Sequence, residues 1–223
     1  LSNLDKKILD QQSQYWEKNF QSKPEMFGLE PSKAALNTIK TFKEKNIKKI
    51  VELGAGLGRD TIFFAKNSIS VEALDYSPAA IKIINKKVLE NKLSKFISTK
   101  IFDVRKKLPF KDNSIEACFS HMLYCMALSN SDLKSLNNEV LRILKPGGIN
   151  IYTTRHTDDG DYKNGTYIAE DLYENDGFIV HFFSKEKIRK ISDGFDIINI
   201  EKFEEGKFPR KLFAVTLKKV LPK

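Results

Sequence analysis

The chain has 223 residues, of which 41% are hydrophobic and 30% charged, so it can bury a substantial core within one domain. No apolar run approaches the roughly 20 residues that a membrane-spanning helix needs. Residues 1–7 show neither the apolar core nor the small-residue cleavage site of a secretion signal. We therefore expect a soluble, cytoplasmic protein, a monomer or homodimer, with Cys118 and Cys125 reduced.

The formal net charge is +9, but only six of the 38 basic residues are arginines. Proteins that bind nucleic acids tend to gather basic residues on one face and to use arginine for bidentate contacts. The lysines here are scattered along the chain and mixed with glutamates. This pattern favours a solvated, lysine-rich surface over a face that binds nucleic acid.

In chain order, apolar periodicity and turn residues predict an alternation of helices and strands. Helices are expected at 3–20, from Pro31 or Ser32 to Phe42, and at 61–66, 78–91, 131–144 and 184–192. Strands are expected at 49–53, 70–74, 96–102, 114–120, 149–154, 195–203 and 210–218. The segment Lys145-Pro146-Gly147-Gly148 should end the fifth helix, 156–180 should be a long loop or insertion, and 204–207 should join the last two strands.

Such alternation predicts an α/β fold, with a parallel sheet covered by helices on both faces. Right-handed crossovers then bring the carboxyl ends of the parallel strands to one edge, where open α/β sheets bind ligands. One domain over 1–223 is expected, in four parts. They are an N-terminal helical lid (1–46), a cofactor-binding core (47–154), a substrate-side insertion (155–183) and a C-terminal helix and hairpin (184–223).

A glycine-rich loop follows the first strand of this alternation and opens a helix. Gly54, Gly56 and Gly58 alternate there, so the backbone can turn tightly and approach a ligand closely. Asp75 ends the next strand, where a carboxylate can accept from both ribose hydroxyls of a nucleoside. Glu52 lies just before the loop, where an acid is unfavourable beside a pyrophosphate and favourable beside a cationic amino-acid group.

Five stretches in this order resemble the class I S-adenosylmethionine-dependent methyltransferases. They are V-E-L-G-A-G-L-G-R-D-T (51–61), A-L-D-Y-S-P (73–78), I-F-D-V-R (101–105), L-P-F-K-D-N-S-I-E-A-C-F-S (108–120) and L-R-I-L-K-P-G-G (141–148). The resemblance implies a Rossmann-like three-layer sandwich. Its seven-stranded, mostly parallel sheet would end in a C-terminal antiparallel hairpin, and S-adenosyl-L-methionine would be the cofactor. Within the family, the small-molecule branches of the tellurite-resistance and thiopurine types are loosely similar.

Position by position, the resemblance implies which residues bind the cofactor. The loop residues Gly54, Ala55, Gly56 and Gly58 would surround its amino-acid portion, with Glu52 and Asp60 near the ammonium group. Asp75 would take the ribose hydroxyls, and Tyr76, Ser77, Phe102, Asp103 and Val104 would lie around the sugar and adenine. Ser120 and His121 would face the methionine end.

Residues for the methyl acceptor are indicated less directly. His121 follows the fourth strand and is the candidate catalytic residue, with a packed loop histidine as the alternative. Tyr15, Trp16, Tyr124 and His156 are candidates for the substrate side, although Tyr15 and Trp16 would serve equally in core packing and His156 in a solvated loop. No histidines have metal-ligand spacing, so no metal is expected.

The acceptor itself is not encoded in a recognisable motif. Aromatic residues in 1–30 and 155–183 favour a closed pocket for a small molecule. An RNA or protein methyltransferase, a non-catalytic cofactor-binding protein and a nicotinamide oxidoreductase remain as alternatives. In-line displacement from a sulfonium asks mainly for positioning, so the absence of an evident catalytic set does not exclude the reaction.

Overall fold

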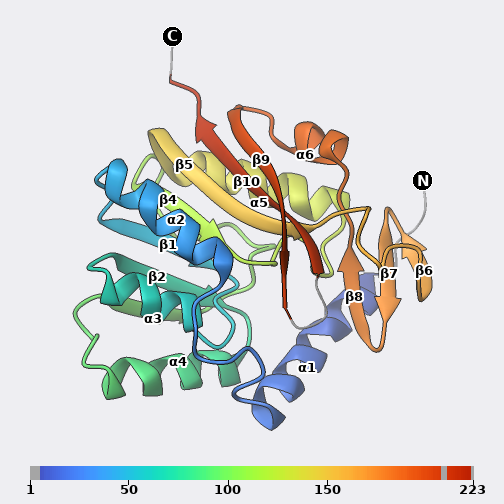
Figure 1. Cartoon of the computed structure of the whole chain (residues 1–223), viewed down its shortest axis with the longest axis horizontal. Coiled ribbons are helices and arrows are strands. Elements are labelled where there is room, and N and C mark those ends of the chain that lie inside the picture. Colours follow the sequence, from blue (N-terminus) through green and yellow to red (C-terminus); the bar gives the residue numbers. More distant parts are fainter. Residues whose placement is uncertain (1–5, 207–209, 222–223) are drawn as a thin grey trace.

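A seven-stranded sheet forms the centre of the computed structural model, which describes residues 6–206 and 210–221. The strands lie in the order β3-β2-β1-β4-β5-β10-β9 (Figure 1). Their bounds are β1 Lys49–Leu53, β2 Ser70–Asp75, β3 Ile97–Ile101, β4 Ile115–Ser120, β5 Leu144–Arg155, β9 Phe195–Glu205 and β10 Arg210–Lys219. The first five are parallel, and β10 runs antiparallel to β5 and β9. The predicted Rossmann-like fold with a C-terminal hairpin is confirmed.

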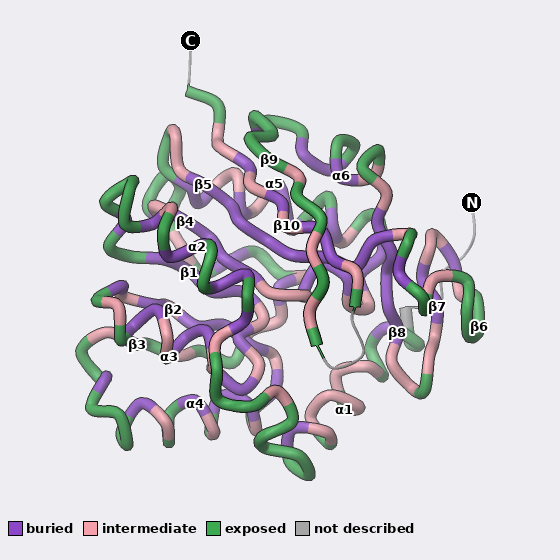
Figure 2. Tube along the Cα trace, in the orientation of Figure 1, coloured by how far each residue is buried: buried purple, intermediate pink, exposed green. Residues whose placement is uncertain are grey.

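Helices cover both faces of this sheet. The described helices are α1 Lys6–Ser22, α2 Lys33–Glu44, α3 Arg59–Lys66, α4 Pro78–Glu90, α5 Asn130–Ile143 and α6 Lys185–Ile191. One apolar core joins α2, α3 and α4 to one face, and another joins α5 and α6 to the other face. The central strands between these layers are mostly buried, whereas the edge strand β9 is largely exposed (Figure 2).

Serine residues set where four of the helices begin. Ser32, Ser77, Ser129 and Ser184 each precede a helix, and each side chain accepts a hydrogen bond from a backbone N–H of the first turn. Such caps satisfy amide groups that have no partner within the helix. Pro78 follows Ser77 at the first helical position, where its fixed φ suits the helix.

The segment 156–180 differs from its prediction. Instead of a long loop, it contains most of a three-stranded antiparallel sheet, formed by β6 Thr166–Ala169, β7 Leu172–Asn175 and β8 Phe178–His181. Two-residue turns join these strands, and positive φ angles at Glu170, Asp171, Asp176 and Gly177 suit such turns. The strands have only four residues each, which is too short for alternation to show clearly in the sequence.

The segment Lys145-Pro146-Gly147-Gly148 also differs from its prediction. Helix α5 ends at Ile143 and β5 begins at Leu144, so these four residues lie inside the strand. Leu144 pairs with Ile115 and Ile149 with Ala117, so the segment forms a bulge opposite Glu116. The predicted helix start at 3–5 and the turn residue Lys207 lie outside the described residues.

Helix α1 joins the two sheets at one end of the molecule. It packs against α4 and against β8, as Figure 1 shows at the lower right. The side chain of Gln12 donates to Gly177 O (2.9 Å) and accepts from Ile179 N (3.1 Å), and Tyr15 Oη donates to Asp176 O (2.9 Å). No helix among the described residues is both long and apolar enough to span a bilayer.

We expect Phe64→Ala to lower the free energy of unfolding by about 3–5 kcal/mol. Phe64 is fully buried and its ring meets Phe119 edge-on, with centroids 4.9 Å apart. Its neighbour Phe63 is only half-buried, so Phe63→Ala serves as the matched control and should have a clearly smaller effect. Urea unfolding measures both, and equal losses would contradict this description of the core.

Candidate active site

A cavity of about 870 Å³ lies at the carboxyl edge of the parallel strands. Its walls come from the loop after β1, the ends of β2 and β4, helix α1, the small sheet and the end of β9. A second cavity of about 430 Å³ adjoins it and is lined by Phe102, Asp103 and Val104 after β3. Trp16, Tyr76, Leu123 and Met126 line both, so the two cavities are direct neighbours.

The glycine loop is built for close approach to a ligand. Gly54, Gly56 and Gly58 have φ angles of 67°, 54° and 77°, which favour glycine. A Cβ on Gly56 would meet no atom nearer than 3.9 Å, so this residue faces open space at the cavity. A Cβ on Gly58 would lie 2.7 Å from a carbon of Ile84, so this glycine instead allows the loop to pack on α4.

Asp75 ends β2 at the wall of the cavity and is only 5% exposed. One carboxylate oxygen accepts from Gly56 N (2.8 Å) and the other from Ser77 N (2.9 Å). Burial raises the pKa of Asp75 to about 6 despite these hydrogen bonds. The carboxylate thus fixes the glycine loop and keeps spare acceptor capacity toward the cavity.

Two more buried acids lie beside the loop. Glu52 accepts from the hydroxyl of Thr61 (2.5 Å), and Asp60 accepts from the backbone and hydroxyl of Ser32, each at 2.7 Å. Burial raises the pKa of both carboxyls, and the charge of Asp60 raises that of Glu52 further. Buried acids without a full cationic partner destabilise a folded chain, so their presence at a cavity indicates a cationic ligand.

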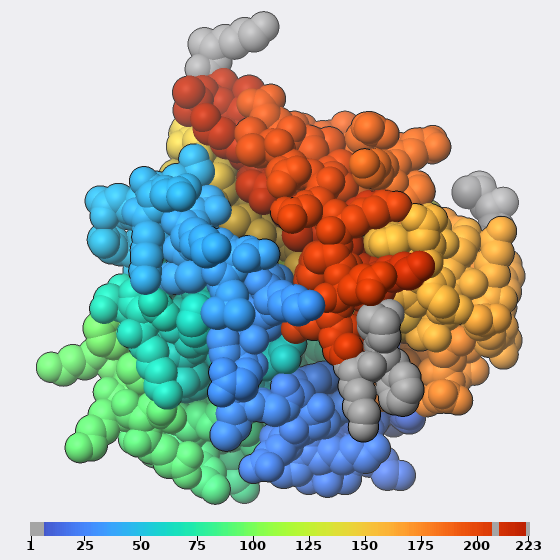
Figure 3. Space-filling model, viewed as in Figure 1, coloured from blue at the N-terminus to red at the C-terminus, as the bar shows by residue number. Residues whose placement is uncertain are grey.

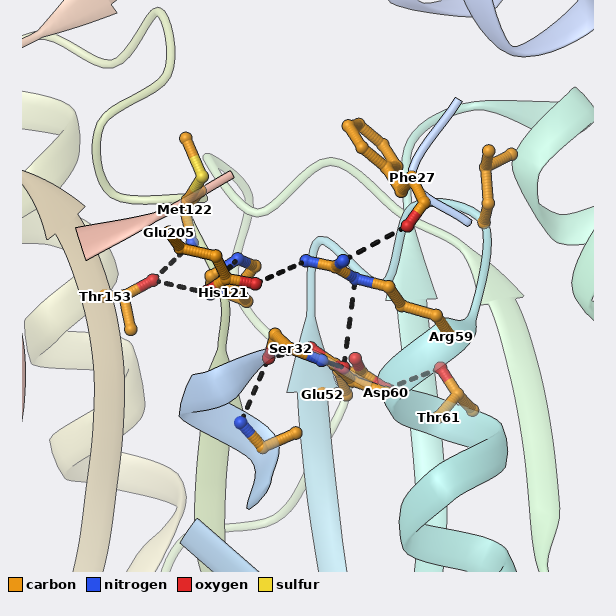
Figure 4. Close-up of polar contacts among 12 residues, drawn as sticks. Phe27, Ser32, Glu52, Arg59, Asp60, Thr61, His121, Met122, Thr153 and Glu205 are labelled. Carbon is orange, nitrogen blue, oxygen red and sulfur yellow. Dashed lines mark hydrogen bonds and ion pairs between the residues drawn. The ribbon is translucent and has the colours of Figure 1, made fainter. Parts of the chain in front are cut away.

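Arg59 is the cation nearest to these acids in the described part of the chain. Its guanidinium donates to Phe27 O (3.2 Å) and lies 3.3 Å from Glu205 Oε1 and 4.0 Å from Asp60 (Figure 4). One side chain therefore links the glycine-loop helix to the end of β9. At the surface, residues around the start of α2 (blue) contact the end of β9 (red), as Figure 3 shows. The side chain of Lys33 donates there to Glu204 O (2.9 Å).

On the side of the smaller cavity, Asp103 is held by Arg105, whose Nη2 lies 2.8 Å away. Arg105 also reaches Asp10 of α1 at 2.6 Å, so it ties the N-terminal helix to the loop after β3. Burial alone would raise the pKa of Asp103, but the hydrogen bonds from Arg105 outweigh it and hold the pKa below its ordinary value.

His121 lies at the end of β4 and faces the larger cavity. Its Nδ1 lies 2.9 Å from the hydroxyl of Thr153, which itself accepts from Met122 N (2.8 Å). The hydroxyl can donate to Nδ1 or accept from it, so this bond is compatible with either neutral tautomer of the ring. Burial, followed by the charges of Arg59 and Arg210, lowers the pKa of His121 to about 3, so the ring is neutral near pH 7.

The structure thus gathers most of the predicted cofactor residues around one site. The larger cavity is lined by Glu52, Gly54, Ala55, Gly56, Asp60, Asp75, Tyr76 and His121, and the smaller one by Phe102, Asp103 and Val104. Six other predicted residues do not line either cavity in the described part of the chain: Tyr15, Gly58, Ser77, Ser120, Tyr124 and His156.

Tyr124 and His156 do not line the cavities because their side chains pack in the interior of the fold. Tyr124 is fully buried, stacks on Tyr152 with ring centroids 3.9 Å apart, and bonds to Asn137. His156 is buried against Phe213. Both side chains therefore pack in the interior, and neither the expected substrate contact nor the solvated-loop alternative for His156 applies.

Several cavity residues were not expected from the sequence. Phe27, Arg59, Arg155, Glu205 and Arg210 line the larger cavity. Arg59 lies within the recognised motif, but nothing in the motif showed that its side chain turns back across the cavity. Glu205 and Arg210 flank the turn between β9 and β10, and only the sheet order brings that turn beside β4 and β5.

Comparison with known proteins agrees with this geometry. Residues 50–148 match a family model described as a methyltransferase domain. A Triticum aestivum phosphoethanolamine N-methyltransferase 1 is 32% identical over 129 residues, 57% of this chain. Over these residues the chain is similar to methyltransferase domains. Its match spans 23% of that relative's length, so it resembles a part of the larger protein.

Two solved structures show how widely this methyltransferase fold is used. A Burkholderia thailandensis 1,6-didemethyltoxoflavin-N1-methyltransferase, solved with S-adenosylhomocysteine, has a TM-score of 0.72 and 14% identity, covering 99% of this chain and 92% of that one. The [4+2]-cyclase SpnF has the same TM-score and identity, covering 95% and 96%. Structural similarity at 14% sequence identity shows only that the folds agree. Because a cyclase shares this fold, the activity of the present chain has to be argued from its site.

The residues present fit the methyl donor of this family. Its sulfonium and ammonium groups are cationic, and the loop offers buried carboxylates that lack a full cationic partner. Its nucleoside needs hydroxyl acceptors and apolar walls, which Asp75, Tyr76, Phe102 and Val104 provide. Together the two cavities have ample volume for a ligand of this kind.

Glu52→Gln should make the ligand-free protein more stable at pH 8. Folding raises the pKa of Glu52 above its value in the unfolded chain. The contribution of this carboxyl to the stability of the wild-type protein is therefore fully present below the unfolded-state pKa and is lost as pH rises through the folded-state pKa. Glutamine still accepts from Thr61 and carries no charge. We expect Tm at pH 8 to rise by at least about 2–4 °C, the shift for 1 kcal/mol in a chain of this size, with a smaller gain at pH 5.

Glu90→Gln, a change at an exposed position of α4, is the control and should leave Tm nearly unchanged at both pH values. Scanning calorimetry without ligand measures all three proteins. A Glu52→Gln protein that is less stable than wild type at pH 8 would show that the buried carboxylate is favourable by itself.

Proposed function

We propose that this protein transfers a methyl group from S-adenosylmethionine to a small-molecule acceptor by in-line displacement. One observation carries the proposal: a glycine loop open to a cavity, flanked by Asp75 and by the buried acids Glu52 and Asp60. This arrangement suits a cationic nucleoside better than a dinucleotide, whose pyrophosphate the acids would repel.

In this proposal, Asp75 receives the ribose hydroxyls with the acceptor capacity that Gly56 and Ser77 leave free. Glu52 and Asp60 attract the ammonium group, and the loop Gly54–Gly58 surrounds the amino-acid portion. Gly58, Ser77 and Ser120 support the site from behind the cavity wall, with Ser77 capping α4. The roles of Glu52, Gly54, Gly56, Asp60 and Asp75 are those that the sequence resemblance implies.

Tyr76, Phe102 and Val104 hold the adenine by apolar contact in the smaller cavity. Asp103 is the proposed acceptor for the adenine amino group. Arg105 already binds both of its oxygens, so the adenine contact uses only acceptor directions that this pair leaves open. Arg105 thereby orients Asp103 and couples it to Asp10 of α1.

When bound, the cofactor supplies an electrophilic methyl group on a sulfonium whose leaving group is neutral. The chain's own residues contribute position and exclusion of water. Helix α1, through Trp16 and Phe20, and the small sheet, through Phe178 and Val180, cover the cavity opposite the glycine loop. We propose the N-terminal segment as a lid and 155–183 as the substrate-side insertion.

A cavity lined by the aromatic side chains of Trp16, Phe20 and Phe178 supports a small acceptor over RNA or protein. The names of two similar proteins, a phosphoethanolamine and a didemethyltoxoflavin methyltransferase, point to small acceptors as well. The cytoplasmic location stays a prediction.

Asp75→Ala should weaken binding of S-adenosylhomocysteine by about 10- to 100-fold, because a buried charged acceptor of ribose hydroxyls is lost. Isothermal titration calorimetry on the full chain measures this. Asp196→Ala, at an exposed position of the edge strand β9, is the control and should bind like wild type. Unchanged affinity in a folded Asp75→Ala protein would remove Asp75 from the site.

Titrations of the wild-type protein with S-adenosylmethionine and with nicotinamide cofactors test the wider assignment. Binding of the methyl donor alone supports the proposal, and preference for a nicotinamide cofactor contradicts it. Methyl-labelled donor and a broad acceptor panel then separate an enzyme from a protein that only binds the cofactor.

A further inference from the structure

Glu205 faces the cavity with one carboxylate oxygen unused. It is the last residue of β9, and its side chain is 17% exposed. Oε1 lies 3.3 Å from Arg59 Nη2, whereas Oε2 is buried and has no hydrogen-bond partner among the described residues. A buried anionic oxygen without a partner is unfavourable, so this atom indicates a missing donor.

His121, which lies beside Oε2, does not supply that donor. His121 Nε2 lies 3.7 Å away, beyond hydrogen-bond distance (Figure 4). The ring is neutral, so no ion pair forms between the two side chains. Both residues line the larger cavity, so a rotation of the Glu205 side chain would present Oε2 to a ligand bound there.

The charges that line the larger cavity indicate which kind of ligand group binds beside Oε2 of Glu205. Seven carboxylate residues line the larger cavity against three arginines, in a chain whose net charge is +9. The carboxylates belong to Glu52, Asp60, Asp75, Asp161, Glu174, Asp176 and Glu205, and the guanidinium groups to Arg59, Arg155 and Arg210. Arg155 is already paired with Asp159 and with Asp161 (2.6 Å), so it does not offset the acids near the loop.

Near the glycine loop, four acids therefore outnumber Arg59 and Arg210: Glu52, Asp60, Asp75 and Glu205. S-adenosylmethionine carries one net positive charge, so the formal charge of these groups stays negative after the cofactor has bound. An anionic acceptor, such as a carboxylate or thiolate, would be repelled there, and a cationic one would be attracted.

We propose that the acceptor is an amine that enters as its ammonium ion, and that Oε2 of Glu205 binds this ammonium and takes its proton. This inference rests on the proposed methyl transfer. The proton moves from nitrogen to the carboxylate, which frees the nitrogen lone pair. That pair forms the bond to the methyl carbon, the carbon–sulfur bond breaks with its electrons on sulfur, and Glu205 releases the proton to solvent.

The surroundings of Glu205 suit this role. Burial raises its pKa, while the charge of Arg59 opposes that rise and helps to keep the carboxylate ionised. A backbone hydrogen bond from Lys33 of α2 also lowers the pKa of Glu205, and the charges of Asp60 and Lys33 act on it with opposite signs. A carboxylate held this way accepts a proton from an ammonium far more readily than from an aliphatic hydroxyl, because the ammonium is the stronger acid.

The test uses the full chain saturated with S-adenosylhomocysteine, so that cofactor binding is established first. Three amines and the alcohols of the same carbon skeleton serve as probes: butylamine with 1-butanol, 2-phenylethylamine with 2-phenylethanol, and tryptamine with tryptophol. Calorimetry should show at least one amine binding about tenfold or more tightly than its alcohol, the size expected for one charge-assisted hydrogen bond.

Glu205→Gln should abolish this preference, because the amide keeps the shape and removes the charge. Glu204→Gln changes the exposed neighbouring acid on the same strand and should leave the preference intact. With methyl-labelled donor, an accepted amine should be methylated about 10²- to 10⁴-fold more slowly by Glu205→Gln, the range for loss of a general base.

If no amine binds better than its alcohol, or if the preference survives in Glu205→Gln, the inference is overturned. Those results leave the proposed function standing as long as S-adenosylhomocysteine binds. Failure of the wild-type protein to bind S-adenosylhomocysteine would instead overturn the proposed function itself.

Discussion

The site depends on carboxylates that the fold buries at one edge of its sheet without neutralising them. Glu52 lies within β1 and Asp75 ends β2, so neighbouring parallel strands hold both acids beside the glycine loop. Asp60 joins them from the first turn of α3. Their raised pKa values show that the ligand-free protein holds these charges at the expense of stability. A cation in the cavity reverses this penalty, so the same feature that weakens the empty protein strengthens ligand binding.

The rest of the chain limits where that cation can lie. Arg105 joins Asp103 to Asp10, and Gln12 and Tyr15 bond to the turn between β7 and β8. These contacts place α1 across the carboxyl edge, where Trp16 lines both cavities. Since α1 contacts both α4 and β8, this helix is held by the main fold and by the small sheet together. Apolar side chains of α1 and β8 line the cavity together with polar residues of the small sheet, such as Glu174 and Asn175.

Local patterns predicted the parallel part of the fold well, because each of its elements has a signal of its own. The strand 49–53 matches β1 in full, and Ser77 with Pro78 marks the start of α4. The small sheet was missed because its four-residue strands show no clear period, although Asp176-Gly177 is a recognisable hairpin turn. The segment 145–148 was interpreted as a helix stop, and its glycines serve instead to form a bulge within β5.

The site shows the same division between local and long-range information. The loop 54–58 and Asp75 are close in sequence and in space, so motif and geometry agree on them. Tyr124 and His156 follow strand ends, as ligand-binding residues often do, yet they turn into the interior, where ring stacking and buried hydrogen bonds hold them. Glu205 is the opposite case. It ends a strand that is remote in sequence from every motif, and it reaches the cavity only because β10 pairs with β5 and brings β9 beside it. In such a fold the cofactor site is encoded locally, whereas the acceptor site is assembled by sheet order, so the first can be recognised from a sequence and the second has to be found in the structure.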